Sequence, residues 1–325
     1  MKDDQLLTIR QLKKYYPVSQ KGWFKKKAGH VKAVDGVDLD LIQGETFGLV
    51  GESGCGKSTL GRCILRLEPP TAGQILFEGI DLLSLKSQAL RTLRQDMQMI
   101  FQDPFSSQNP RHTIRRIVGE PLTIHGMGSH KEDRIRALMD TVGMRPEHLD
   151  RYPHEFSGGQ RQRICIARAL ALNPKLIIAD EPVSALDVSI QAQILNLLVG
   201  LQQKFQLTYL FISHDLSVVR HLCDRIAVMY LGNIVEIAPR DGLYSTPAHP
   251  YTQALLDAIP TTSLTRREQT PPLTGDMPSP MNPPPGCPFH PRCRYKQDKC
   301  AQNKPMLKTI AQGRRVACHF PLFES

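Results

Sequence analysis

The chain has 325 residues and a mass of 36.5 kDa, enough for one large domain or two modest ones. Its 41% hydrophobic and 22% charged residues exclude a fibrous or wholly disordered protein. The formal net charge of +10 favours an anionic partner such as a nucleotide, nucleic acid or anionic lipid. No apolar run approaches the ~20 residues of a membrane span, and the polar N-terminus does not resemble a signal peptide. We therefore expect a cytoplasmic location.

Short apolar runs alternate with amphipathic helical patterns along the first two-thirds of the chain. Strands are expected at 45–50, 97–101, 176–179 and 208–212, and helices from 57 onward and at 158–172, 189–204 and 216–223. This alternation predicts an α/β fold around a sheet with a substantial parallel part. Two further runs, 226–230 and 235–237, flank Leu231-Gly232-Asn233 and predict a hairpin at the edge of that sheet.

A proline-rich stretch divides the chain. Ten prolines lie between Pro260 and Pro291, which predicts an extended connector because proline fixes φ and lacks a backbone donor. Four of the eight cysteines follow within or after it. We place a boundary near residue 260, with a main domain at 1–260 and a small extension at 261–325.

A phosphate-binding pattern follows the first buried strand. Residues 51–58 read G-x-x-x-x-G-K-S and precede an expected helix. Glycines let backbone N–H groups turn toward phosphates, Lys57 neutralises the β and γ oxygens, and the Ser58 hydroxyl is a ligand for Mg²⁺. The residues expected to contact a nucleotide here are Gly51, Ser53, Gly54, Cys55, Gly56, Lys57, Ser58 and Thr59.

A second nucleotide motif is formed by the apolar run 176–179 and the two acids that follow it. Ligands bind at the carboxyl ends of strands in open α/β sheets. Asp180 is therefore expected to bind Mg²⁺, and Glu181 to polarise an attacking water. Together the two motifs indicate a nucleoside triphosphate hydrolase or kinase.

A third candidate anion site opens the helix expected at 158–172. Ser157 is suited to cap that helix, while Gly158 and Gly159 let its amides approach a phosphate. Gln160 follows them in the segment Ser-Gly-Gly-Gln. In isolation this segment is an ordinary helix cap, and its position between the two nucleotide motifs gives it significance.

These motifs resemble the ATP-binding cassette (ABC) family. The resemblance implies ATP and Mg²⁺ as ligands, a helical subdomain at about 103–172 and a head-to-tail dimer in which Ser157–Gln160 completes the partner's ATP site. It also implies roles for four further residues: Gln102 beside Mg²⁺, Asp187 in the loop after Glu181, His214 near the γ-phosphate and Tyr16 against adenine. Each has an ordinary structural explanation alone, but their order makes chance agreement negligible. The implied catalytic residues are Glu181 and His214.

Further segments resemble the dipeptide and oligopeptide permease branch: 101–104, 109–111, 249–256 and 283–287. The resemblance implies an ATPase that energises peptide import from the cytoplasmic side of the inner membrane. Its implied partners are a homologous second ATPase, two membrane subunits and an extracytoplasmic peptide-binding protein, with no nucleic acid. The alternatives are a soluble, non-transport ABC ATPase or an importer of nickel, haem or antimicrobial peptides.

The extension contains four cysteines with long spacings: Cys287, Cys293, Cys300 and Cys318. Four thiolates suit a [4Fe–4S] cluster or a tetrahedral Zn²⁺, and such a staple stabilises a small segment with few core residues. Four unliganded thiols are the alternative. The peptide-permease resemblance implies the cluster.

Overall fold

The computed structural model describes residues 4–18, 29–259 and 275–323. Their contacts divide into two compact units. The first unit is built mainly from Ser84–Ile212 with Ile42–Thr46, and the second from Gln5–Leu41, Phe47–Leu83 and Ser213–Ser325. Part of the expected proline-rich connector, residues 260–274, lies outside the described residues.

The first unit is organised around three parallel strands: β6 (Met97–Ile100), β7 (Leu176–Asp180) and β8 (Thr208–Ser213). The register pairs Ile100 with Ala179 and Asp180 with Ile212. Every residue of β7 and β8 is buried, as expected for strands of a parallel sheet that is covered on both faces. These strands were predicted to within one residue or so at each end.

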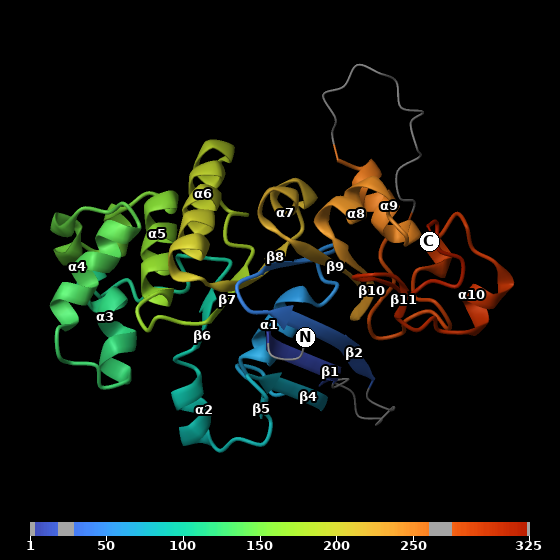
Figure 1. Cartoon of the computed structure of the whole chain (residues 1–325), viewed down its shortest axis with the longest axis horizontal. Helices are drawn as coiled ribbons and strands as arrows, with labels where there is room; N and C mark the ends of the chain where they lie inside the picture. The colour runs from blue at the N-terminus through green and yellow to red at the C-terminus, as the bar shows by residue number, and fades with distance from the viewer. Residues whose placement is uncertain (1–3, 19–28, 260–274, 324–325) are drawn as a thin grey trace, which may run out of the picture. The chain divides into compact units, whose positions relative to one another are not determined.

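Helices make up the rest of the first unit: α2 (Ser87–Leu93), α3 (Ile114–Ile124), α4 (Lys131–Thr141), α5 (Gly158–Ala169) and α6 (Val188–Phe205), with 3₁₀ turns at Pro146–Asp150 and Pro153–Glu155. In Figure 1, α3, α4 and α5 lie side by side, and contacts join each of them to the other two. Buried Ile117, Ile135 and Ile164 form part of the core between them. This cluster falls within the segment expected to be helical, 103–172.

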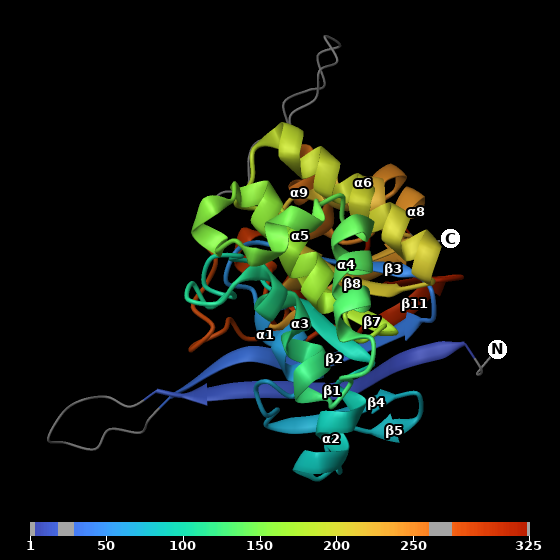
Figure 2. The ribbon, with the colours of Figure 1, turned by 90° about the vertical axis from the view of Figure 1, so that its left-hand side faces the viewer.

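The second unit contains a four-stranded antiparallel sheet that the sequence patterns did not reveal. Its strands are β1 (Gln5–Pro17), β2 (His30–Ile42), β4 (Ala72–Phe77) and β5 (Ile80–Asp81), in the order β2-β1-β4-β5. Figure 2 shows the long β1 and β2 strands running together, with β4 and β5 nearby. The register pairs Leu7 with Phe77, and both side chains are fully buried.

The remaining strands of the second unit correct one prediction. β3 (Thr46–Val50) pairs in parallel with β9 (Arg225–Tyr230), which forms the expected hairpin with β10 (Asn233–Pro239). The hairpin is not at the edge, because β12 (Arg314–Val316) pairs with the other side of β10, and β11 (Lys308–Ala311) pairs with β12. Strands of three and four residues with charged side chains give little periodic signal, so their pairing was not foreseen.

Short helices complete the second unit: α1 (Lys57–Ile64), α7 (Leu216–Leu222), α8 (Arg240–Ser245), α9 (Pro250–Asp257) and α10 (Asp298–Gln302), with a 3₁₀ turn at His290–Arg292. Within the described ranges, no helix has the length and apolar character needed to cross a membrane. The expected α/β fold with a mixed sheet is confirmed by the parallel and antiparallel pairings together.

Candidate functional site

The phosphate loop connects the end of β3 to the start of α1. Gly51 and Gly56 have positive φ angles of 155° and 111°. A Cβ atom would lie 2.2 Å from the Met229 carbonyl oxygen at Gly51, and 2.0 Å from the Ala33 carbonyl oxygen at Gly56. Neither site has room for a side chain, so these two glycines are required by the close approach of neighbouring backbone.

Lys57 begins α1 and its side chain is buried within the loop. The ammonium donates to the carbonyl oxygens of Gly51, at 2.7 Å, and of Glu52, at 3.0 Å. Ser53 and Gly54 are exposed, whereas Ser58 and Thr59 are half-buried in the first turn of α1. The N-terminal end of α1 adds backbone N–H groups to this loop. The arrangement offers a cation and amide donors to an incoming phosphate.

Cys55 of the same loop is only 1% exposed. Burial raises the pKa of its thiol, although the nearby Lys57 ammonium opposes that shift. The thiol is therefore protonated and shielded at neutral pH. This makes Cys55 a small filling residue of the loop rather than a reactive group.

The two acids at the end of β7 occupy different environments. Asp180 is 1% exposed, whereas Glu181 is half-buried and has a positive φ of 46°. The Glu181 N–H donates to the Ile212 carbonyl oxygen at 3.0 Å, and its carboxylate accepts from Gln102 Nε2 at 3.0 Å. Positive φ in a non-glycine residue costs energy and is concentrated at functional sites. The first unit thus brings together Gln102 and Glu181, two residues that were predicted separately.

The Ser-Gly-Gly-Gln segment forms a capping box at the start of α5. Gln160 N–H donates to Ser157 Oγ, and Ser157 N–H donates to Gln160 Oε1. Gly159 has an additional structural reason to be glycine, because a Cβ there would lie 2.5 Å from Ile190 Cγ2 on α6. The exposed Ser157 side chain and the half-buried Gly158 leave the helix start accessible.

The remaining predicted site residues lie at the ends of helices and strands. Asp187 is exposed at the N-cap position of α6 without a side-chain cap bond, and His214 is exposed just before α7. Tyr16, near the end of β1, donates its hydroxyl to Glu68, and Lys14 Nζ lies 4.7 Å from the ring centre. Burial and the Glu68 hydrogen bond raise the pKa of Tyr16 to about 12. The phenol is therefore neutral and fixed in place.

The predicted residues are distributed over both units. Gln102, the Ser157–Gln160 segment, Asp180, Glu181 and Asp187 belong to the first unit. Tyr16, the loop residues Gly51–Thr59 and His214 belong to the second.

The four cysteines of the extension line one small cavity of about 10 Å³, together with His290 and His319. Burial is the main reason why the pKa of Cys287 rises to about 11 and that of Cys318 to about 12. Both histidines already bond to backbone carbonyl groups, of Cys287 and Asn303. All eight cysteines are free thiols.

The sulfur atoms of these four cysteines are suitable metal ligands, but their arrangement is not that of a metal site. Four sulfur atoms around one cavity are the ligands that zinc or an iron–sulfur cluster takes. In the described part of the chain, however, no three or more His, Cys, Asp or Glu side chains are arranged to hold a metal ion. The structure therefore does not support a formed metal or cluster site, and the cavity has room for about one small atom.

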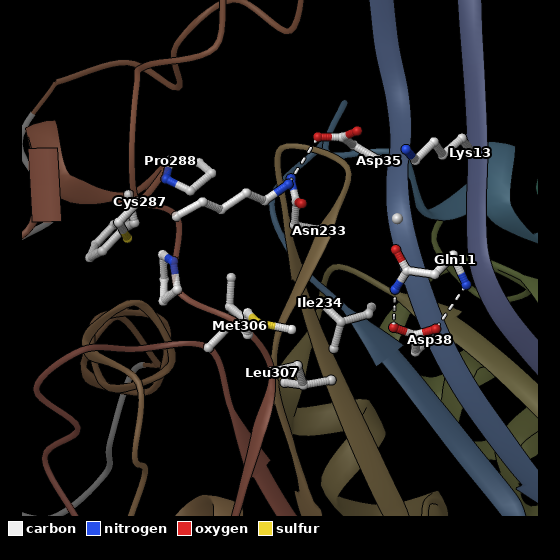
Figure 3. Close-up of a pocket in the computed structure, with 16 residues that line it drawn as sticks. Gln11, Lys13, Asp35, Asp38, Asn233, Ile234, Cys287, Pro288, Met306 and Leu307 are labelled. Carbon is white, nitrogen blue, oxygen red and sulfur yellow. Dashed lines mark hydrogen bonds and ion pairs between the residues drawn. The ribbon is translucent and has the colours of Figure 1, made fainter. Parts of the chain in front are cut away.

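A wider cavity of about 340 Å³ lies between β1, β2, β10 and the C-terminal residues. Figure 3 shows Gln11, Asp35 and Asp38 on one wall, with Cys287, Pro288, Met306 and Leu307 opposite. Its acids have partners: Lys304 Nζ pairs with Asp35 at 3.0 Å, and Gln11 bonds to Asp38. At this cavity the extension is joined to the antiparallel sheet by the Lys304–Asp35 ion pair.

Comparison with protein-family profiles gives two matches. Residues 34–184 match the profile described as ABC transporter. Residues 235–300 match the profile described as the C-terminal region of oligopeptide/dipeptide transporters. The second match includes most of β10, all of α9 and the first three cysteines of the extension.

Among curated proteins, the chain is 55% identical over 322 residues to the oligopeptide transport ATP-binding protein AppF of Bacillus subtilis (strain 168), covering 97% of each. It is 52% identical over 315 residues to the dipeptide transport ATP-binding protein DppF of Escherichia coli (strain K12), covering 96% of this chain and 93% of that protein.

Among solved structures, the ATP-binding cassette MJ0796, as a dimer in a post-hydrolysis state bound to ADP and Pi, matches with a TM-score of 0.63. The sequence identity is 28%, and the match covers 72% of this chain and 98% of MJ0796.

Proposed function

Because the chain belongs to the ATP-binding proteins of ABC transporters, in the branch of oligopeptide and dipeptide transport, and is an ATPase, we propose that its ATP hydrolysis energises the import of short peptides. The cassette fold, the ATPase activity and the resemblance to this branch, all expected from the sequence, are confirmed. The observation that carries the peptide assignment is the similarity over nearly the whole chain, including the C-terminal region that matches the oligopeptide/dipeptide profile.

The ATP site is proposed to use the predicted residues as follows. Lys57 and the amides of 51–59 bind the phosphates, and Tyr16 stacks on adenine. Glu181, oriented by Gln102 at 3.0 Å, accepts a proton from the water that attacks the γ-phosphorus. His214 stabilises the charge that develops there.

Ser58 and Asp180 carry the hard oxygen donors that Mg²⁺ prefers, and both are proposed to bind the ion. When bound with ATP it neutralises phosphate charge. Gln102 is proposed as the third residue at the ion. The segment Ser157–Gln160, with its accessible helix start, and Asp187 are proposed to act at the ATP site of a partner cassette.

The proposed partners are a homologous second ATPase, two membrane permease subunits and an extracytoplasmic peptide-binding protein. The chain itself would be peripheral, on the cytoplasmic face of the inner membrane. The dimeric cassette structures with which it aligns support pairing of two cassettes. The chain is also proposed to consist of a main domain at 1–260 and an extension at 261–325.

A metal centre at the four cysteines is a second proposal, with a [4Fe–4S] cluster preferred to zinc. It is supported by the four sulfur donors that line one cavity. A cluster would require those side chains to move outward from the small cavity. Iron, sulfide and zinc analysis of protein purified without oxygen tests it. Iron with sulfide supports the cluster, bound zinc alone replaces it, and four alkylatable thiols with no metal reject both.

Uptake in the host organism tests the cargo. Strains that lack this gene should lose uptake of labelled dipeptides or oligopeptides, while nickel and haem uptake continue. Wild-type chain should restore uptake, whereas Lys57→Ala, which weakens ATP binding, and Glu181→Gln, which traps bound ATP, should not. Loss of nickel or haem uptake with normal peptide uptake would select the other cargo. Normal uptake of all three would favour a non-transport ATPase.

A further inference from the structure

Glu52, in the phosphate loop, is bound by two residues from far along the chain. Its N–H donates to the hydroxyl of Tyr251 at 2.9 Å, across 199 positions of sequence. Its carboxylate accepts from Arg292 Nη1 at 3.0 and 3.1 Å, across 240 positions. All three residues belong to the second unit.

The Arg292 side chain is shielded from solvent, with 8% of it exposed against 28% for Glu52. Its guanidinium lies 5.9 Å from the centre of the Tyr230 ring. Burial disfavours its charge, but the nearby Tyr230 and the hydrogen-bonded Glu52 carboxylate outweigh that cost and raise its pKa. A shielded, charge-assisted pair of this kind is stronger and less sensitive to salt than an exposed one.

An aromatic cluster fixes the position of both partners of Glu52. The Phe289 ring, in the extension, lies 5.4 Å from Tyr230 and 5.3 Å from Tyr251. Tyr251 and Tyr230 are fully buried, with ring centres 4.7 Å apart. Rigid neighbours leave the Tyr251 hydroxyl and the Arg292 guanidinium few alternative positions. The extension therefore holds Glu52 through a packed surface rather than through a mobile side chain.

The backbone of Glu52 also holds the lysine of the phosphate loop, Lys57. The Lys57 ammonium donates to the carbonyl oxygens of Gly51 and Glu52. Moving the peptide unit at Glu52 would displace one of these acceptors and change the curve of the loop. A chain of contacts thus runs from the extension, through Arg292 and Glu52, to Lys57.

We propose that Arg292, in the C-terminal extension, and Tyr251, which packs against Phe289 of the extension, are positioning residues of the ATP site that hold the phosphate loop in its nucleotide-binding shape. The proposal rests on the assignment of residues 51–59 to ATP binding. The extension then contributes to ATP binding, whether or not it also binds a metal. Arg292 touches no substrate itself, so its effect should appear in nucleotide affinity.

The test compares full-length variants by the Kd of a fluorescent ATP analogue, by KM and kcat for ATP, and by thermal midpoint. Arg292→Met should raise Kd and KM by about fivefold or more while kcat stays within about twofold. Arg292→Lys, which keeps a charge on Glu52, should recover part of that loss. Tyr251→Phe, which removes only the hydroxyl, should raise Kd by about two- to fivefold.

Lys304→Met is the matched control, because it breaks another ion pair between the extension and the rest of the unit, Lys304 with Asp35. It should leave Kd unchanged. Glu52→Gln should weaken binding as Arg292→Met does, and the double variant should be no worse than either single one. If Arg292→Met lowers the thermal midpoint but leaves Kd and KM at wild-type values, the proposal is overturned.

Failure of the ATP-site assignment gives a different result. In that case Lys57→Ala binds the analogue as well as wild type does. If Lys57→Ala does weaken binding of the analogue, and Arg292→Met raises Kd no more than Lys304→Met does, only the positioning role is rejected.

Discussion

The amide of Gln102 donates to the carboxylate of Glu181 at 3.0 Å, although 79 positions separate the two residues. Gln102 follows β6 and Glu181 follows β7, and these strands are parallel neighbours whose register pairs Ile100 with Ala179. Side chains that leave the same edge of a parallel sheet are brought together in this way. The proposed general base is therefore held by a residue that the sequence assigned a separate role.

Replacement of Gln102 should slow hydrolysis without weakening ATP binding. Gln102→Ala leaves the Glu181 carboxylate without this donor, so kcat should fall by about tenfold with KM nearly constant. Gln102→Glu places a like charge beside Glu181, which should move the pH profile of kcat to higher pH. Ser106→Ala, four residues further along the chain, is the control. Identical pH profiles for wild type and Gln102→Glu would contradict the contact.

Two helical glycines, one in α5 and one in α6, should respond in opposite directions to alanine. At Gly159 the new Cβ would meet Ile190 Cγ2 at 2.5 Å, so Gly159→Ala should lower the free energy of unfolding by about 1–3 kcal/mol. At Gly200, inside α6, a new Cβ would meet no atom within 4 Å beyond its own stretch of helix, so Gly200→Ala should raise it by about 0.4–1 kcal/mol. Urea unfolding measures both. Equal effects would contradict the packing explanation.

His249 should make stability depend on pH. It is buried at the N-cap of α9, where Nδ1 accepts from Tyr251 N–H, and burial lowers its pKa from 6.5 to about 3. Below pH 6.5 the unfolded chain binds a proton that the folded chain excludes. The His249 contribution is thus complete above that pH and falls by about 2 kcal/mol between pH 8 and pH 5.

His249→Asn keeps a capping acceptor and should remove that part of the pH dependence of urea unfolding. The pKa of neighbouring Glu236 is raised by burial, so Glu236 makes the protein less stable as the pH rises, opposite to His249. Wild type and His249→Asn must therefore be compared at each pH. His130→Asn, at an exposed histidine, should keep the wild-type slope. A His249→Asn slope equal to that of wild type would show that His249 does not titrate differently on folding.

Cys55 should resist thiol reagents despite its place in the phosphate loop. It is 1% exposed with a raised pKa, so iodoacetamide should label it at least about tenfold more slowly in native than in urea-unfolded protein. Mass spectrometry of the labelled peptides measures this. Rapid native labelling, with Cys63 protected in the same sample, would show that the loop opens.

Local patterns allowed much of the site to be predicted from the sequence. The run 46–50 with the glycines and lysine of 51–58 specifies a strand, a tight loop and a helix start within one segment, as does 176–181 for β7 and its acids. The capping role of Ser157 was foreseen for the same reason, since both partners of the cap lie within one helical turn. Functional groups that are neighbours in the sequence can therefore be predicted without knowing which distant segments are in contact.

Contacts between distant segments were decided only by the tertiary structure. The sequence contained Arg292 and Glu52 but no local signal that they pair, and the short strands β11 and β12 gained their place only by pairing beyond β10. Gly159 was expected for phosphate approach, yet the fit against Ile190 also requires it. Such pairings depend on long loops closing and on shape within a packed core, and neither leaves a periodic trace in the chain.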